Sequence, residues 1–117
     1  MKNIMLVEDD LDMNFILTDL LKRSGYRVDS YISGEEALEN LEDNNYDAII
    51  ADYNLPGMDG IEMLEKIPSR YCKMRKIVIS AYGNEIILSK TKQLHARYLD
   101  KPFRNYQLLN LIAQENY

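Results

Sequence analysis

Acidic, hydroxyl and ammonium side chains occur at four places in the sequence where a short apolar run ends. They are the acidic run 8–10, the single acid Asp52, the hydroxyl of Ser80 and the ammonium group of Lys101. Apolar runs that stop abruptly at such residues are typical of strands buried in a parallel sheet. Ligands bind at the carboxyl ends of such strands, so we expect these groups to form one site.

The acids in this set predict a metal site. Two carboxylates about 4 Å apart repel by about 4 kcal/mol at an effective dielectric of 20, so Glu8, Asp9 and Asp52 need a cation or a proton between them. Mg²⁺ held by one or two carboxylates and several waters is the usual solution. Considered alone, the run 8–10 is equally typical of a solvated turn whose acids cap a helix.

The same groups fit the capture of a phosphoryl group by Asp52. A carboxylate that attacks phosphorus becomes an acyl phosphate, and the incoming group brings roughly two negative charges. Mg²⁺, Lys101 and Ser80 could each bind one of its oxygens, at about 1.5–3 kcal/mol per charge-assisted hydrogen bond. A cis Lys101-Pro102 bond would turn the lysine inward, whereas a trans bond with the lysine in solvent would argue against the site. Considered singly, Ser80 is typical of a turn and Lys101 of a surface lysine.

The elements that must position these residues alternate between short apolar runs and helical patterns. This alternation predicts one α/β domain over residues 1–117, with a flavodoxin-like, doubly wound, five-stranded parallel sheet in the order 2-1-3-4-5 and five helices. We expect strands at 4–7, 27–31, 47–51, 76–79 and 98–99, and helices at 11–23, 33–41, 61–67, 84–93 and 105–115. In the first helix we expect the core-facing residues to be Phe15, Ile16, Leu20 and Leu21. We expect Ser33 to cap the second helix, and Asp59 to be a turn and cap residue and not a metal ligand.

The composition narrows the class of protein. Hydrophobic residues make up 46% of the 117 residues, which is enough for one core. The net charge of −5 and the scattered positions of the 14 Lys and Arg argue against direct nucleic-acid binding. The single cysteine, Cys72, excludes an intrachain disulfide and is typical of a reducing compartment. Neither a secretory segment nor an apolar stretch of about 18 residues is found, so we expect a cytoplasmic protein without membrane insertion.

Four segments of the sequence resemble the receiver domain of two-component response regulators. They are residues 4–10, 52–60, 79–81 and 98–103, and they occur in order at the predicted strand ends. The resemblance covers essentially the whole chain. It implies a signalling domain that promotes only its own Mg²⁺-dependent phosphorylation and dephosphorylation, and not an enzyme that turns over other substrates.

The resemblance also implies a phosphoacceptor and its metal ligands. Asp52 would take a phosphoryl group from the phosphohistidine of a histidine kinase or of a histidine phosphotransfer protein. Asp9 and Asp52, with the backbone carbonyl of Asn54, would bind Mg²⁺. Glu8 would act on the metal through water.

A switch between two surface states is a further implication. Ser80 would move to hydrogen-bond the phosphoryl group, and Lys101 would be the lysine of the family pattern. Tyr98 would then enter the space that Ser80 leaves, which changes the surface formed by the fourth helix, the fifth strand and the fifth helix. Asn54 and Tyr82 would flank the path of the attacking water, and we expect the bulky Tyr82 to shield the acyl phosphate.

The expected partners follow from this family. A histidine kinase or phosphotransfer protein would dock near the first helix, where Met13, Phe15 and Ile16 could offer apolar contacts. Some of these side chains must instead belong to the core. The output would be a downstream protein target or a separate output domain. A stand-alone carrier and a receiver excised from a longer regulator both stay open, as does dimerisation of the monomer on phosphorylation.

Two other α/β functions share parts of this site. A phosphohydrolase of the haloacid-dehalogenase type also uses a nucleophilic Asp, Mg²⁺, a Ser or Thr and a Lys, but it needs a second Asp as general acid where this chain has Asn54. A flavodoxin would bind flavin in the same crevice. It needs a phosphate loop rich in Ser, Thr and Gly, where this chain has the acids 8–10, which repel phosphate.

Overall fold

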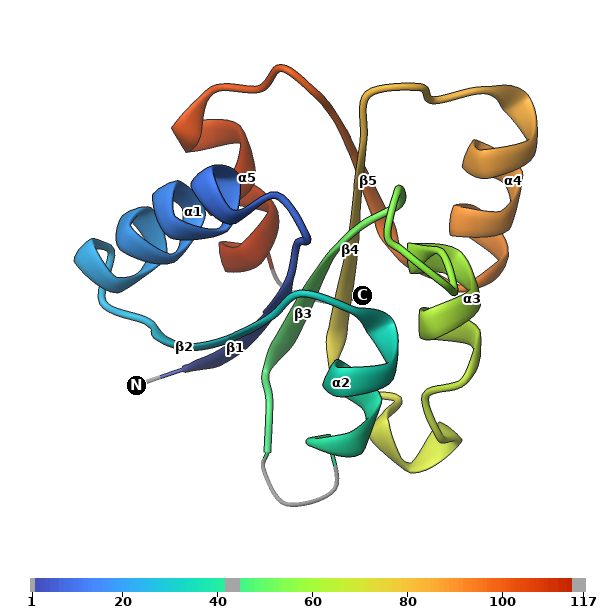
Figure 1. The fold of residues 1–117 in the computed structure, drawn as a ribbon, viewed down its shortest axis with the longest axis horizontal. Helices are drawn as coiled ribbons and strands as arrows, with labels where there is room; N and C mark the ends of the chain where they lie inside the picture. The colour runs from blue at the N-terminus through green and yellow to red at the C-terminus, as the bar shows by residue number, and fades with distance from the viewer. Residues whose placement is uncertain (1, 42–44, 115–117) are drawn as a thin grey trace.

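The chain folds into a parallel sheet covered by helices on both faces (Figure 1). The computed structural model describes residues 2–41 and 45–114. The strands are β1 (Asn3–Val7), β2 (Arg27–Tyr31), β3 (Ala48–Asp52), β4 (Arg75–Ser80) and β5 (Arg97–Asp100). The helices are α1 (Leu11–Arg23), α2 (Gly34–Glu39), α3 (Gly60–Glu65), α4 (Glu85–Gln93) and α5 (Asn105–Ala113), with a short 3-10 helix at Ser69–Tyr71. The strand order is β2-β1-β3-β4-β5, as predicted.

The two helical layers enclose two separate cores. Helices α1 and α5 cover one face of the sheet, and α2, α3 and α4 cover the other (Figure 1). Alternate residues of β1 serve the two layers: Ile4 and Leu6 pack in the α1/α5 core, and Met5 and Val7 pack in the opposite core. Every residue of β3 is buried, whereas the edge strand β2 is largely exposed. The central, doubly covered position of β3 therefore places its last residue, Asp52, between both layers.

The buried face of α1 differs from the predicted one. Leu17 and Leu21 are buried, and Leu20 packs half-buried against the same core. Phe15 and Ile16 were predicted to face the core, but their exposed fractions are 73% and 57%. That prediction was wrong because the face lying on the sheet is centred on Leu17 and Leu21. At about 100° per residue, Phe15 and Ile16 project away from it.

Local signals mark the helix ends. The Ser33 side chain accepts a hydrogen bond from a backbone N–H in the first turn of α2, as predicted for a cap. Gly25 follows α1 with φ of 95°, a left-handed conformation that favours glycine. The predicted end of the fifth helix, Glu115, lies outside the described residues, and α5 extends to Ala113. Across residues 2–41 and 45–114, no helix has both the length and the apolar character needed to cross a membrane.

Candidate functional site

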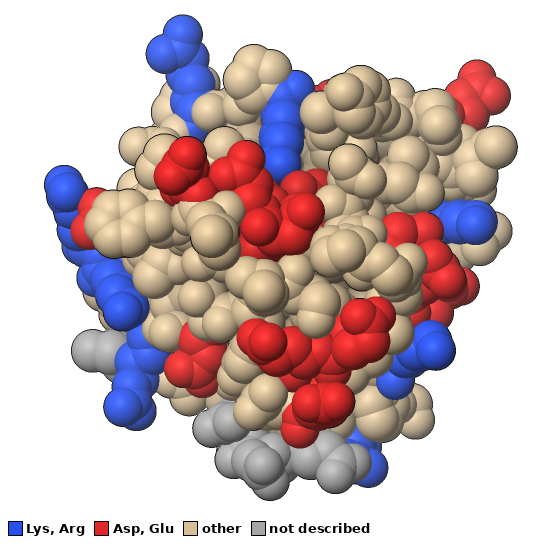
Figure 2. All heavy atoms as spheres, in the orientation of Figure 1, with Lys and Arg blue, Asp and Glu red and all other residues tan. Residues whose placement is uncertain are grey.

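The predicted site residues meet at the carboxyl edge of the sheet. Asp52 and Ser80 are the last residues of β3 and β4, and Glu8 and Lys101 directly follow β1 and β5. These four strands are consecutive neighbours in the sheet, so their ends converge. Figure 2 shows acidic side chains gathered near the top of the viewed face, with a basic side chain beside them.

Three carboxylates form the centre of the site. One oxygen from each of Glu8, Asp9 and Asp52 lies within 4.8 Å of the other two. Glu8 and Asp52 are only 2% and 7% exposed, whereas Asp9 faces solvent. Asp10, the fourth acid of this region, instead caps α1 by accepting a hydrogen bond from the Met13 N–H. The cluster therefore offers oxygen ligands open to solvent on one side, which suits Mg²⁺.

Lys101 reaches into this cluster and pairs with two of its acids. Its Nζ lies 2.9 Å from Asp52 Oδ2 and 3.2 Å from Glu8 Oε1. The Lys101-Pro102 peptide bond is cis and the lysine side chain points inward, so both conditions set by the sequence are met. Burial alone would lower the pKa of Lys101, but the hydrogen bond and charge of Asp52, with those of Glu8, raise the pKa above its usual value. The ammonium group is therefore positively charged in the crevice at neutral pH.

Glu8 is the most strongly perturbed acid of the site. Burial, followed by the charge of Asp52, raises its pKa from 4.5 to about 7. A hydrogen bond from the Asp10 N–H and the charge of Lys101 oppose this change without cancelling it. Near neutral pH a proton on Glu8 therefore competes with a cation for the crevice.

Ser80, Tyr82 and Asn54 surround the crevice. Ser80 is buried, and its Oγ accepts a hydrogen bond from the Tyr82 N–H at 3.0 Å. The Asn54 N–H donates to Asp52 Oδ1 at 3.2 Å. The Tyr82 side chain is 76% exposed, and Asn54 is also exposed. These contacts tie the loops after β3 and β4 to the site, and they leave both side chains at its rim.

Tyr98 of β5 packs against the loop that follows β4. Its hydroxyl donates a hydrogen bond of 2.8 Å to Asp100 Oδ1 and lies 3.5 Å from the Ser80 carbonyl oxygen. The ring is half-buried against the core on the α2/α3/α4 side. Burial, then the hydrogen bond to Asp100, raises the pKa of Tyr98 above its ordinary value.

The loop between β3 and α3 is held by contacts from α2 and from the start of α3, of which the contact from Glu35 was not predicted from the sequence. A Cβ atom on Gly60 would lie 2.4 Å from the Asp52 carbonyl oxygen, so only glycine permits this close approach. The Glu35 carboxylate at the start of α2 accepts a hydrogen bond from the Met58 N–H at 3.3 Å. Asp59 forms a reciprocal capping box with Glu62 at the start of α3, which agrees with its predicted role as a cap and not as a metal ligand.

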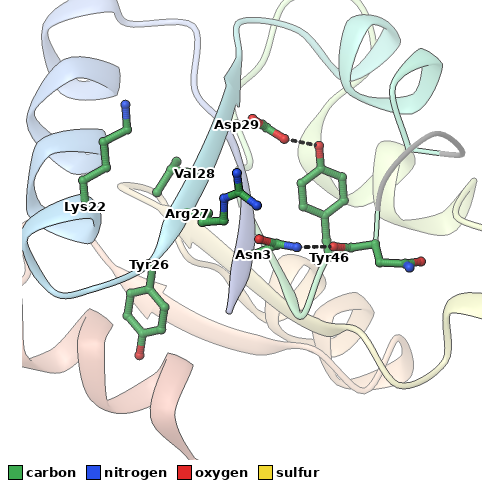
Figure 3. Close-up of a pocket in the computed structure, with 8 residues that line it drawn as sticks. Asn3, Lys22, Tyr26, Arg27, Val28, Asp29 and Tyr46 are labelled. Carbon is green, nitrogen blue, oxygen red and sulfur yellow. Dashed lines mark hydrogen bonds between the residues drawn. The ribbon is translucent and has the colours of Figure 1, made fainter. Parts of the chain in front are cut away.

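A polar cavity of about 500 Å³ lies at the opposite, amino-terminal edge of the sheet (Figure 3). It is lined by residues that include Lys22, Arg27 and Tyr46, and the Tyr46 hydroxyl donates to Asp29 at 2.7 Å. None of its lining residues belongs to the acid cluster. The cavity is therefore separate from the candidate site.

Comparisons with known sequences agree with this arrangement. A family model described as the response regulator receiver domain matches residues 4–113. The chain is 36% identical to the response regulator protein FleR of Pseudomonas aeruginosa over 95% of its own length, but it spans only 24% of FleR. It is 31% identical to the response regulator receiver protein CpdR of Brucella abortus, covering 97% of this chain and 96% of CpdR. It is 29% identical to the sporulation initiation phosphotransferase F of Bacillus subtilis, covering 87% and 83% of the two chains.

Solved structures show the same fold. A CheY-like response regulator receiver domain protein from Methanospirillum hungatei superposes with a TM-score of 0.91 at 28% identity, covering 96% of this chain and 90% of that one. The chemotaxis protein CheY4 of Vibrio cholerae gives 0.87 at 26% identity, with 94% of each chain covered. The chain belongs to the receiver domain family of two-component response regulators.

Proposed function

We propose that this receiver domain accepts a phosphoryl group on Asp52 from the phosphohistidine of a histidine kinase or of a histidine phosphotransfer protein. The observation that carries the proposal is the setting of Asp52, a nearly buried carboxylate inside an acid cluster with Lys101 Nζ at 2.9 Å. An Asp52 oxygen would form the new bond to phosphorus while the bond between phosphorus and the histidine nitrogen breaks. The nitrogen keeps that electron pair, and the donor histidine is released as a neutral imidazole when its other ring nitrogen carries a proton.

The acid cluster would hold Mg²⁺. Three carboxylates with oxygens within 4.8 Å of one another match the hard, oxygen-rich ligand set that this ion prefers. We assign Asp9, Asp52 and the backbone carbonyl of Asn54 as its ligands, with Glu8 acting through water. The bound ion would neutralise charge on the acids and on the phosphoryl oxygens.

Lys101 and Ser80 would orient the phosphoryl group. Lys101 already bridges Asp52 and Glu8, so its ammonium group is in place to hold a phosphoryl oxygen once Asp52 is modified. The Ser80 hydroxyl accepts the Tyr82 N–H, and it is the group we expect to turn toward the phosphate. Each such charge-assisted hydrogen bond would contribute about 1.5–3 kcal/mol.

Phosphorylation would be read on the surface formed by α4, β5 and α5. Movement of Ser80 would change the conformation of the loop that follows β4. The Tyr98 hydroxyl lies 3.5 Å from the Ser80 carbonyl oxygen at the start of this loop, so it would sense the change. The phosphoryl group shifts this equilibrium only by its difference in affinity for the two states. The altered surface would bind a downstream protein or a separate output domain, with dimerisation as one form of that output.

An apolar cavity of about 360 Å³ beside Lys101 is a suitable docking place for the phosphodonor. It lies between α1 and the segment after β5, and its lining includes Met13, Ile16 and Phe103. Phe15 on the same helix is largely exposed. Both residues that were wrongly predicted to face the core, Phe15 and Ile16, are thus available to a partner. Ile16 also lines this cavity together with the lysine that contacts Asp52.

The cellular setting is part of the proposal. We expect a cytoplasmic signalling protein that promotes only its own phosphorylation and dephosphorylation. Both organisations stay open, because CpdR has nearly the length of this chain, whereas FleR is about four times as long. Neither a haloacid-dehalogenase-type hydrolase nor a flavodoxin is favoured by any contact at the site.

The direct test is incubation with acetyl phosphate and Mg²⁺, followed by intact-mass measurement. The wild-type protein should gain the mass of one phosphoryl group, and Asp52→Asn should not. Asp59→Asn is the matched control. Asp59 caps α3 at the end of the loop that follows Asp52, and Asn is also a good cap, so this substitution should leave both the fold and the mass gain unchanged. No mass gain in the wild type, or equal gain in Asp52→Asn, would refute the assignment. Repeated turnover of a phosphomonoester would instead favour a hydrolase.

A further inference from the structure

The hydroxyl of Tyr98 occupies a space that exists because residue 83 has no side chain. A Cβ atom on Gly83 would lie 2.1 Å from the Tyr98 hydroxyl oxygen and 2.8 Å from its Cζ. Both distances are far inside van der Waals contact, so any side chain at this position excludes the observed orientation of Tyr98. In the described part of the chain only Gly25 and Gly57 are glycines with positive φ. Position 83 therefore requires glycine because the Tyr98 ring occupies the place of a side chain, and not because of its backbone conformation.

Asp100 holds the same hydroxyl from another side. Tyr98 and Asp100 are two residues apart on β5, so their side chains lie on one face of the sheet. Asp100 Oδ1 accepts the Tyr98 hydroxyl hydrogen bond at 2.8 Å. The same Oδ1 would lie 3.1 Å from a Cβ on Gly83. Gly83, Tyr98 and Asp100 thus form one set of contacts beneath the loop between β4 and α4.

We propose that Gly83 and Asp100 are positioning residues that keep Tyr98 docked under this loop and set the fraction of molecules in which it is docked. The docked orientation is the one with the Tyr98 hydroxyl bonded to Asp100 and packed on Gly83. The inference rests on the proposed role of Tyr98 in the switch, and it adds the residues that regulate that role. Both act through Tyr98.

The loop that receives Tyr98 begins directly after Ser80, the last residue of β4. The Ser80 hydroxyl accepts a hydrogen bond from the backbone N–H of Tyr82, which immediately precedes Gly83. The Ser80 carbonyl oxygen lies 3.5 Å from the Tyr98 hydroxyl. A movement of Ser80 toward a phosphoryl group would therefore move the surface on which Tyr98 docks. Docking and phosphoryl binding are coupled through this loop, and the coupling acts equally in both directions.

Gly83→Ala is a selective test because the clash falls on a side chain that can rotate. The methyl group meets the far end of Tyr98, so the least costly response is for the tyrosine to leave its docked position. Tyrosine Cζ labelling and NMR report on each of the nine hydroxyl groups, and the Tyr98 signal is assigned from its loss in Tyr98→Phe. In Gly83→Ala we expect this signal to shift and the pKa of Tyr98, read from the same signal, to fall toward the ordinary value.

An internal control separates this effect from general loss of structure. Tyr46 is buried at the other edge of the sheet, where its hydroxyl donates to Asp29 at 2.7 Å. Its signal should be unchanged in Gly83→Ala. An unchanged Tyr98 signal in a variant whose Tyr46 signal is native would overturn the inference.

Asp100 variants test the hydrogen bond itself. Asp100→Ala removes the acceptor and should lower the ratio of docked to undocked Tyr98 by about five- to tenfold, the effect of one hydrogen bond. Asp100→Asn keeps an acceptor oxygen and should restore most of the docked population. Equal effects of the two substitutions would show that Asp100 does not act by accepting this hydrogen bond.

Beryllofluoride with Mg²⁺, an inert mimic of a phosphoryl group, tests the coupling to the site. It should increase docking of Tyr98 in the wild type, and its affinity should fall in Asp100→Ala, by at most about five- to tenfold. Undiminished affinity in Asp100→Ala would refute the coupling. Failure to bind to the wild type would contradict the proposed function of Asp52, whereas the Tyr98 measurements above need no phosphoryl mimic and test the positioning residues alone.

Discussion

Glu8 should make the stability of the metal-free protein depend on pH in the direction opposite to that of an ordinary paired acid. Burial and the charge of Asp52 raise its pKa from 4.5 to about 7 in the folded protein. Above pH 7 the residue is charged in both the folded and the unfolded states, and the raised pKa corresponds to a cost of about 3 kcal/mol to folding. As the pH falls from about 7 to 4.5, the folded protein takes up the proton first. The cost is then progressively relieved.

Glu8→Gln removes this titration and is the perturbation of choice. Without Mg²⁺, the substitution should raise the free energy of unfolding by up to about 3 kcal/mol at pH 8, and by much less near pH 5. The measurement is urea unfolding followed by circular dichroism at both pH values in the presence of a chelator. Glu65→Gln, which alters an exposed glutamate of α3, is the matched control. An equal effect of Glu8→Gln at both pH values would refute the reasoning.

The same proton should compete with Mg²⁺. Because Glu8 is part of the acid cluster, the Mg²⁺ affinity of the wild type should fall as the pH drops below 7, by at most about tenfold per pH unit. Calorimetric titration at several pH values measures this slope. The slope should be flatter in Glu8→Gln, and an unaltered slope would show that Glu8 is not the competing group.

Two further substitutions test the loops around the site. Tyr82→Ala should speed the loss of phosphate from Asp52 by about two- to tenfold, because it opens the rim to water; an unchanged decay of the phosphorylated mass would contradict the shielding role. Gly60→Ala should lower the free energy of unfolding by about 1–3 kcal/mol. Its Cβ would lie 2.4 Å from the Asp52 carbonyl oxygen, and a backbone atom cannot rotate away from the clash as the end of a side chain can. Gly25→Ala, which has open space but φ of 95°, should cost about 1 kcal/mol. A Gly60→Ala effect no larger than that of Gly25→Ala would argue against the clash.

The features that the sequence by itself determined are those that depend on local pattern. The apolar run ending at Asp52 predicted a doubly covered central strand, and every residue of β3 is buried. Ser33 and Asp59 were predicted as caps, and both accept the expected backbone hydrogen bonds. Each of these caps forms between residues that are only three positions apart in the sequence. The strand order followed from the alternation of elements, which placed four strand ends at one edge of the sheet.

The remaining features required the packing of distant segments. Which face of α1 is buried depends on how that helix lies on the sheet, and this left Phe15 exposed. The pKa of Glu8 is set by burial and by Asp52, which is brought close only by the pairing of β1 with β3. The contact between Gly83 and Tyr98 joins a loop to a strand beyond the next helix, so neither residue signals the other in the sequence. Residue types and spacing thus specified which groups the candidate site contains. The distances between segments far apart in the sequence decided the pKa of Glu8 and the need for glycine at position 83.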